Sequence, residues 1–203
     1  MLTSLDVGHN KLTEQAALGI VRVARQQDKI TNLGLGGCNI GPIGAREIAD
    51  YIQFTAVLTT LFLSDNNIGN EGAKVISEAL KVNAVLTKLE LDYNSIGDDG
   101  AKAIAEALKV NAVLTDLALW INGIGDEGAI AIAEALKVNA VLTKLNLSGN
   151  SIGDEGARAI AEALKVNAVL TKLDIRINHH MGDAGKEAVR DAVKDRSGFV
   201  LEL

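Results

Sequence analysis

The chain alternates two hydrophobic patterns with a fixed period of 28 residues. In segments such as 86–91, Leu89 and Leu91 alternate with polar residues, the pattern of a strand that is buried on one face. A second segment follows each of these, as in 97–108, where Ala101, Ile104 and Leu108 lie on one apolar helical stripe. The sequence therefore predicts repeated strand–helix units.

We expect these units to form a single domain over residues 1–203, because no proline-rich linker interrupts them. Helical crossovers between consecutive strands require a parallel sheet with right-handed connections. Helices are about 10 Å wide and strands lie about 4.8 Å apart, so stacking both bends the array. We expect a curved α/β solenoid with strands on the concave side and helices on the convex side. The predicted units are 2–29, 30–57, 58–85, 86–113, 114–141, 142–169 and 170–197, followed by a short strand at 199–203.

A polar residue follows each predicted strand at a constant place. Its side chain can satisfy backbone groups that are left open where the strand turns inward. The second unit has Cys38 at this place, and we expect a structural role for its thiol. The asparagines at this position are Asn10, Asn66, Asn94, Asn122, Asn150 and Asn178.

Both ends of the predicted helices also carry repeated residues. Negative charges at the starts complement the helix dipole, so we interpret them as helix starts and not as a metal cluster. At the helix ends, asparagines such as Asn111 are expected to adopt the left-handed conformation that closes a helix. The acidic residues are Asp98, Asp99, Asp126, Glu127, Asp154 and Glu155.

The whole chain resembles the ribonuclease-inhibitor-like subfamily of leucine-rich repeat proteins. Residues 142–152 read LxxLxLxxNxI, and the helix entry reads NxIGDEGAxAIAEAL. The pattern is also similar to the repeats of intracellular innate-immune receptors, tropomodulin-like actin regulators and Ran GTPase-activating proteins. This resemblance implies a leucine-rich repeat solenoid that acts as a non-enzymatic protein-binding scaffold.

Composition removes several function classes. The net charge of −6 disfavours binding to nucleic acid or to an anionic membrane. One cysteine excludes an internal disulfide and favours a reducing compartment, and no apolar segment is long enough to span a membrane. No catalytic motif is present, and the adjacent His179 and His180 make a poor pair of metal ligands. We therefore expect no catalytic residue, cofactor or metal, and a cytoplasmic location.

The outward-facing strand positions vary between units, whereas the helices repeat almost verbatim. Packing constrains the helices and leaves these positions free, so they are the candidate binding surface. Aromatic residues rimmed by charge are typical of binding hot spots, although neutral variation is the alternative interpretation. We predict a protein partner with an apolar anchor and a basic flank, bound at Phe62, Glu90, Asp92, Tyr93, Asp116, Trp120, Ile121, Lys144 and Arg176.

Two further observations keep a second hypothesis open. Segments 103–115, 131–143 and 159–171 are identical, which favours an engineered or consensus-derived scaffold with no native ligand, possibly self-assembling. The first unit begins directly at a strand, whereas Lys186 and Arg190 introduce charge into the last helix. An uncovered strand and core face is a liability, so we expect either that the chain is a fragment of a longer array or that its N-terminal edge frays or self-associates.

Overall fold

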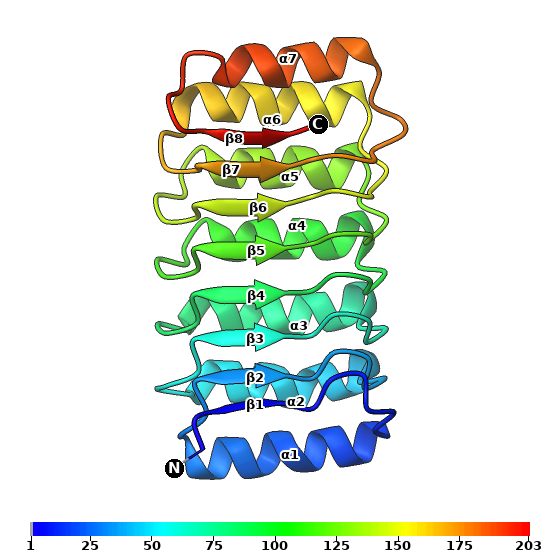
Figure 1. Ribbon diagram of the computed structural model, residues 1–203, viewed down its shortest axis with the longest axis vertical. Coiled ribbons are helices and arrows are strands. Elements are labelled where there is room, and N and C mark those ends of the chain that lie inside the picture. The colour runs from blue at the N-terminus through cyan, green and yellow to red at the C-terminus, as the bar shows by residue number, and fades with distance from the viewer. Residues whose placement is uncertain (1) are drawn as a thin grey trace.

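A computed structural model describes residues 2–203, in which eight strands alternate with seven helices (Figure 1). All strands are parallel and form one open sheet in the order β1 to β8. The helices form a second layer behind the sheet and are spaced more widely than the strands, so the array curves with the sheet on its inner side (Figure 1). The predicted α/β leucine-rich repeat solenoid is confirmed.

Every strand is short and every helix spans three to four turns. The strands are β1 (Ser4–Asp6), β2 (Asn32–Gly34), β3 (Thr60–Phe62), β4 (Lys88–Glu90), β5 (Asp116–Ala118), β6 (Lys144–Asn146), β7 (Lys172–Asp174) and β8 (Val200–Glu202). The helices are α1 (Glu14–Gln27), α2 (Gly41–Phe54), α3 (Gly69–Val82), α4 (Gly97–Leu108), α5 (Asp126–Leu136), α6 (Asp154–Val166) and α7 (Asp183–Val193).

Neighbouring strands pair between equivalent positions of the repeat. Leu61 pairs with Leu89, and Leu89 pairs with Leu117. These central leucines point into the core and are at most 1% exposed. The residues on either side of them point to the concave surface, because successive side chains of a strand alternate between its faces. This register places each outward position beside its counterpart in the next unit.

The turn asparagines form a ladder through the core. Asn94 donates from Nδ2 to the backbone oxygens of Leu63, Leu91 and Asp92, at 2.8–3.0 Å. Its Oδ1 accepts hydrogen bonds from the backbone N–H groups of Asn66 and Ile68 in the preceding unit. Asn66, Asn122, Asn150 and Asn178 bond in the same way, so each satisfies its own turn and the preceding turn at once.

The asparagines after the helices form a second ladder, and the predicted left-handed conformation is wrong. Asn83 and Asn167 have extended backbones, with φ of −69° and −82°. Asn111 does not have a positive φ either, and its Nδ2 donates to the oxygen of Leu80 in the preceding helix at 2.7 Å. These side chains satisfy the open carbonyl groups at the C-terminus of the previous helix, a tertiary contact that outweighs the local preference.

The acidic helix starts contribute a third contact between units. Oδ1 of Asp126 accepts hydrogen bonds from the backbone N–H groups of Gly153 and Gly156, at 2.8 and 2.7 Å. Asp98 and Asp154 make the same contacts with their following helices. Each carboxylate thus caps the helix of the next unit, where open donors and the helix dipole favour negative charge.

Cys38 occupies the asparagine position of the second unit and is fully buried. Its Sγ lies 3.6 Å from the oxygen of Gly36, and its N–H donates to Oδ1 of Asn66. Burial, with a smaller effect of Asp6, raises the pKa of the thiol. A buried thiol with a raised pKa is a poor nucleophile, which agrees with a structural role.

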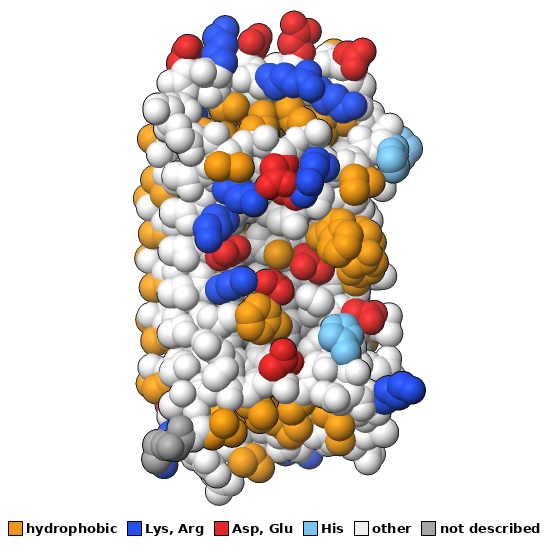
Figure 2. All heavy atoms as spheres, viewed as in Figure 1, with side chains coloured by type: hydrophobic (Ala, Val, Ile, Leu, Met, Phe, Trp, Pro, Cys, Tyr) orange, Lys and Arg blue, Asp and Glu red, His pale blue; other side chains and the backbone are white. Residues whose placement is uncertain are grey.

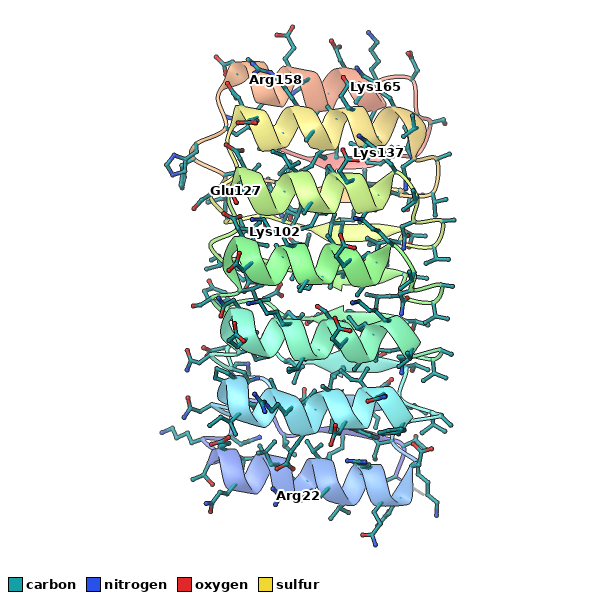
Figure 3. The ribbon with its side chains drawn as sticks, turned by 180° about the vertical axis from the view of Figure 1, so that it is seen from behind. Arg22, Lys102, Glu127, Lys137, Arg158 and Lys165 are labelled. Atoms are coloured by element: carbon teal, nitrogen blue, oxygen red, sulfur yellow. The ribbon has the colours of Figure 1, made fainter. Side chains whose placement is uncertain are left out.

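The convex surface is a solvated face crossed by ion pairs. Lys102 on α4 and Glu127 on α5 lie on adjacent helices and approach to 2.6 Å (Figure 3). At the C-terminal ends of α4 and α5, Lys109 pairs with Glu106, and Lys137 pairs with Glu134. Exposed pairs of this type contribute only about 0–1 kcal/mol each, so the stability of the array depends on the core and its ladders.

Asn150→Ala should reduce the free energy of unfolding by about 1–3 kcal/mol, because it removes five hydrogen bonds of the first ladder. Asn10→Ala is the matched control. Asn10 is exposed and bonds only within its own turn, so its replacement should cost less than about 0.5 kcal/mol. Urea unfolding followed by circular dichroism measures both values, and equal losses would contradict the ladder's role.

Candidate functional site: the concave surface

The residue types on the inner face of the sheet differ from unit to unit more than those of the helices do. Figure 2 shows charged side chains scattered across this face and a cluster of large hydrophobic side chains beside the middle strands. The surface contains a hollow of about 480 Å³ beside Tyr93 and Trp120, and a second of about 330 Å³ beside Asp116 and Lys144. Asp92 lines both hollows.

Tyr93 and Trp120 form the aromatic centre of the surface. Their rings meet edge to face, with centroids 4.7 Å apart and planes at 78°. Tyr93 is 43% exposed and Trp120 is half-buried. Trp120 also packs on Gly149, where an added Cβ would lie 2.8 Å from the indole Nε1. The missing side chain at Gly149 therefore allows the indole to lie against the next unit.

A carboxylate from the preceding unit holds the backbone of Trp120. Oδ1 of Asp92 accepts a 2.8 Å hydrogen bond from the Trp120 N–H. In other units this N–H is satisfied by the residue two positions earlier in the same strand, namely Asp6, Asn146 or Asp174. The corresponding residue here is Ala118, which offers no side-chain acceptor. Asp92 replaces that acceptor and so fixes Trp120 to the fourth unit.

The environment of Asp92 makes its carboxyl group unusually weak as an acid. Burial raises its pKa from 3.8 to about 6, and this outweighs the opposing hydrogen bond from Trp120. The negative charge of Glu90 adds to the increase, while Lys88 acts against it. The charge of Asp92 therefore changes in the mildly acidic range.

The remaining predicted charges are mostly paired within the surface. Lys88 approaches Glu90 to 2.8 Å, and Lys144 lies 3.6 Å from Asp116. At the far end, Arg176 pairs with Asp174 at 2.7 Å and also with Glu202. Phe62 is not part of the Tyr93–Trp120 pair. The ammonium group of Lys88 instead lies 5.0 Å from the centre of its ring.

One column of the surface has a left-handed backbone in every unit. Its φ values are positive throughout, and they include 55° at Tyr93 and 49° at Ile121. Glycine adopts this conformation freely, but β-branched residues such as Ile121 and Ile177 do so only at a cost in energy. The column consists of His9, Gly37, Asp65, Tyr93, Ile121, Gly149 and Ile177.

The structure adds His9, Ser64 and Asp65 to the aromatic hollow, and these were not among the predicted binding residues. His9 and Asp65 occupy the same column as Tyr93 and Ile121. The column was therefore the signal that could have identified them. His9 belongs to the first unit, and its imidazole packs over Gly36 and Gly37 of the second.

Comparisons with known proteins agree with this architecture. The family model described as "Leucine Rich repeat" matches residues 1–20, 56–77, 82–105, 110–133 and 138–161, more than half of the chain. The chain belongs to the leucine-rich repeat family. A search of curated proteins found no match to this leucine-rich repeat protein.

Two solved structures resemble this leucine-rich repeat protein. The first is titled "Leiomodin-1 Actin-Binding Site 2 (ABS2)"; it is 31% identical over 62% of this chain and 72% of that chain, with a TM-score of 0.53. The second is the tropomodulin C-terminal domain of Caenorhabditis elegans, 18% identical over 63% of this chain and 80% of that one, also with a TM-score of 0.53. The second likeness shows the fold alone. Together with the repeats, these findings support a protein-binding repeat domain in a typically non-enzymatic family.

The N-terminal edge of this leucine-rich repeat protein carries an apolar hollow of about 510 Å³. It lies between β1 and α1, and Leu5, Ile20, Val23 and Ile30 are among the residues that line it. Val23 is 52% exposed. Self-association through this edge stays a prediction.

Within residues 2–203, no group of three or more histidine, cysteine or acidic side chains is arranged to hold a metal ion. In the same part of the chain, no helix is both long and apolar enough to cross a membrane.

Ile177→Asn should increase the free energy of unfolding by about 0.5–1 kcal/mol. Ile177 has a φ of 57°, a conformation that asparagine adopts more readily than isoleucine. Its side chain is 58% exposed, so the replacement removes little buried apolar surface. Val110→Asn is the control, because Val110 is 62% exposed and does not have a positive φ. Chemical unfolding of both variants tests this expectation, and a loss of stability in Ile177→Asn would contradict it.

Asp92→Asn should increase the free energy of unfolding at pH 7 by about 1 kcal/mol, allowing for solvent screening of a half-buried group. Because the folded pKa is raised, the stability contributed by Asp92 is fully present below about pH 4 and is lost as the pH rises through about 6. The variant should therefore show a smaller decline in stability than the wild type between pH 4 and pH 6.

The matched control for this measurement is Asp99→Asn, which makes the same charge change at an exposed position on α4. Asparagine at position 92 retains an oxygen that can accept the Trp120 N–H, so the comparison isolates the ionisation. The two variants should differ when unfolding is measured across this pH range. Identical pH profiles would show that Asp92 does not titrate as described.

Proposed function

We propose that this chain binds a protein partner through the concave surface of its sheet, with Trp120 and Tyr93 at the centre of the interface. The observation that carries this proposal is the edge-to-face pair of exposed Tyr93 and half-buried Trp120, which charged side chains surround on the concave face. Tryptophan, tyrosine and arginine dominate the binding energy of protein interfaces, and aromatic anchors are surrounded there by polar rims.

The pre-organisation of Trp120 supports this role. Its backbone is fixed by Asp92, one side of its indole is supported by Gly149, and Tyr93 contacts its ring. A side chain that is already ordered loses little conformational entropy when a partner binds. A half-buried tryptophan that only faced solvent would not need these three contacts.

Backbone strain at the same place gives further support. Tyr93 and Ile121 keep large side chains at positive φ, whereas the equivalent positions Gly37 and Gly149 are glycine. Strained residues persist where the surrounding structure supports them, and they concentrate at functional sites. Large side chains at these two positions are therefore consistent with selection for contact area.

The leiomodin-1 neighbour suggests a first partner to test. Its title names an actin-binding site, and its sequence is 31% identical to the matched part of this chain. Actin is therefore the first purified candidate, and affinity capture from a cell lysate extends the search to other proteins.

Trp120→Ala should weaken partner binding by about 2 kcal/mol or more, which is about a 30-fold change in the dissociation constant. Because Trp120 is half-buried, the variant should lose about 1 kcal/mol of folding stability, so binding is compared well below the melting temperatures of both proteins. Isothermal titration with purified actin and quantitative capture from lysate provide the two readouts.

Phe54→Ala is the matched control, since Phe54 is an aromatic residue that is 66% exposed at the end of the convex helix α2. It should leave binding within about twofold of the wild type. A partner that binds the wild type and Trp120→Ala equally would place the recognition surface elsewhere. Recovery of no specific partner would favour the alternative of an engineered or consensus-derived scaffold.

A further inference from the structure

The aromatic hollow has an unusual balance of charge for this surface. It is lined by His9, Ser64, Asp65, Asp92, Tyr93 and Trp120 and encloses about 480 Å³. Two of these residues are acidic, and no lysine or arginine is among them. The hollow therefore combines two carboxylates with two aromatic rings and is lined by neither lysine nor arginine.

The other carboxylates along the middle and far strands have cations beside them. Lys88 pairs with Glu90, Lys144 with Asp116, and Arg176 with both Asp174 and Glu202. Within residues 2–203, neither Asp65 nor Asp92 has a basic side chain within ion-pair distance. Carboxylates that stay unpaired on a surface rich in lysine and arginine leave a place for a cation from outside.

The geometry of the two rings is also suited to a cation. In an edge-to-face pair, the ring that presents its edge keeps its own faces clear of the other ring. A guanidinium or ammonium group is attracted to the face of tryptophan or tyrosine. Asp92 uses Oδ1 to hold Trp120, so its Oδ2 remains available beside the rings for a hydrogen bond to such a group.

We propose that this hollow binds an arginine side chain of the partner, with the guanidinium group against the Tyr93–Trp120 pair and hydrogen-bonded to Asp92 and Asp65. Arginine fits better than lysine, because a planar guanidinium stacks on an aromatic ring while its in-plane N–H groups bind carboxylates. The net charge of −6 also favours an approaching basic segment. The inference rests on the proposed function and specifies the partner's chemistry.

Trp120 is the single tryptophan of the chain, so its fluorescence and its indole N–H signal in NMR report on this hollow alone. The probe is a short peptide, blocked at both ends, with one central arginine. Matched peptides carry citrulline, which is nearly isosteric and uncharged, or lysine. We expect saturable changes of the Trp120 signals with the arginine peptide, about tenfold weaker binding of citrulline, and intermediate binding of lysine.

Asp92→Asn and Asp65→Asn should each weaken binding of the arginine peptide about five- to tenfold, because each removes a charge-assisted hydrogen bond. Asp99→Asn makes the same change in net charge at an exposed position on the convex side and should alter binding less than twofold. Equal binding of the arginine and citrulline peptides would overturn the proposal. So would equal effects of Asp65→Asn and Asp99→Asn, or the absence of a saturable change in both signals.

These outcomes separate the arginine pocket from the broader function. A partner that requires Trp120, combined with no response to the arginine peptide, would retain the concave interface and overturn the arginine pocket. A specific response to the arginine peptide, combined with partner binding that is unaffected by Trp120→Ala, would retain the pocket and overturn the interface proposal.

Discussion

The hydrogen-bond register between successive units is the constraint on which the rest of this structure depends. A parallel strand of three residues cannot stabilise itself, and each unit leaves open backbone groups at its strand exit, its helix start and its helix end. The side chains of Asn94, Asn111 and Asp126 make hydrogen bonds to these backbone groups at the strand exit, the helix end and the helix start, respectively. Each of these bonds crosses the boundary between two units. Stability is therefore shared between neighbours, as expected for a solenoid.

This constraint explains where the chain varies. The ladders and the core leave little freedom at buried positions, because an unsatisfied buried polar group or a cavity costs a few kcal/mol. Most outward strand positions are only partly buried, so this restriction is weaker there. Variation therefore concentrates on the concave face, where Tyr93, Trp120 and the surrounding charges are displayed on a rigid support.

The repeat register also allows one unit to supply a hydrogen-bond acceptor that its neighbour lacks. Ala118 cannot accept the hydrogen bond that Asp6, Asn146 and Asp174 accept in their own units, and Asp92 accepts it from the adjacent strand. The consequence is a carboxylate that is half-buried beside an aromatic pair, with a pKa raised to about 6. A repeat that supplied its own acceptor would leave the residue equivalent to Asp92 free to turn toward solvent.

The 28-residue period by itself determined the parallel sheet, its strand order and the leucines that fill the core, since equal spacing brings equivalent residues into contact. It also placed Tyr93 and Trp120 in adjacent units. Only the tertiary structure decided that Asp92 caps Trp120, that Asp126 caps the following helix and that Asn111 reaches the preceding one. It alone brought His9 of the first unit into the hollow lined by Trp120 of the fifth. The physical reason is that the repeat period specifies only which residues occupy equivalent positions in neighbouring units. The direction of each side chain and the curvature of the sheet depend on how all units pack together.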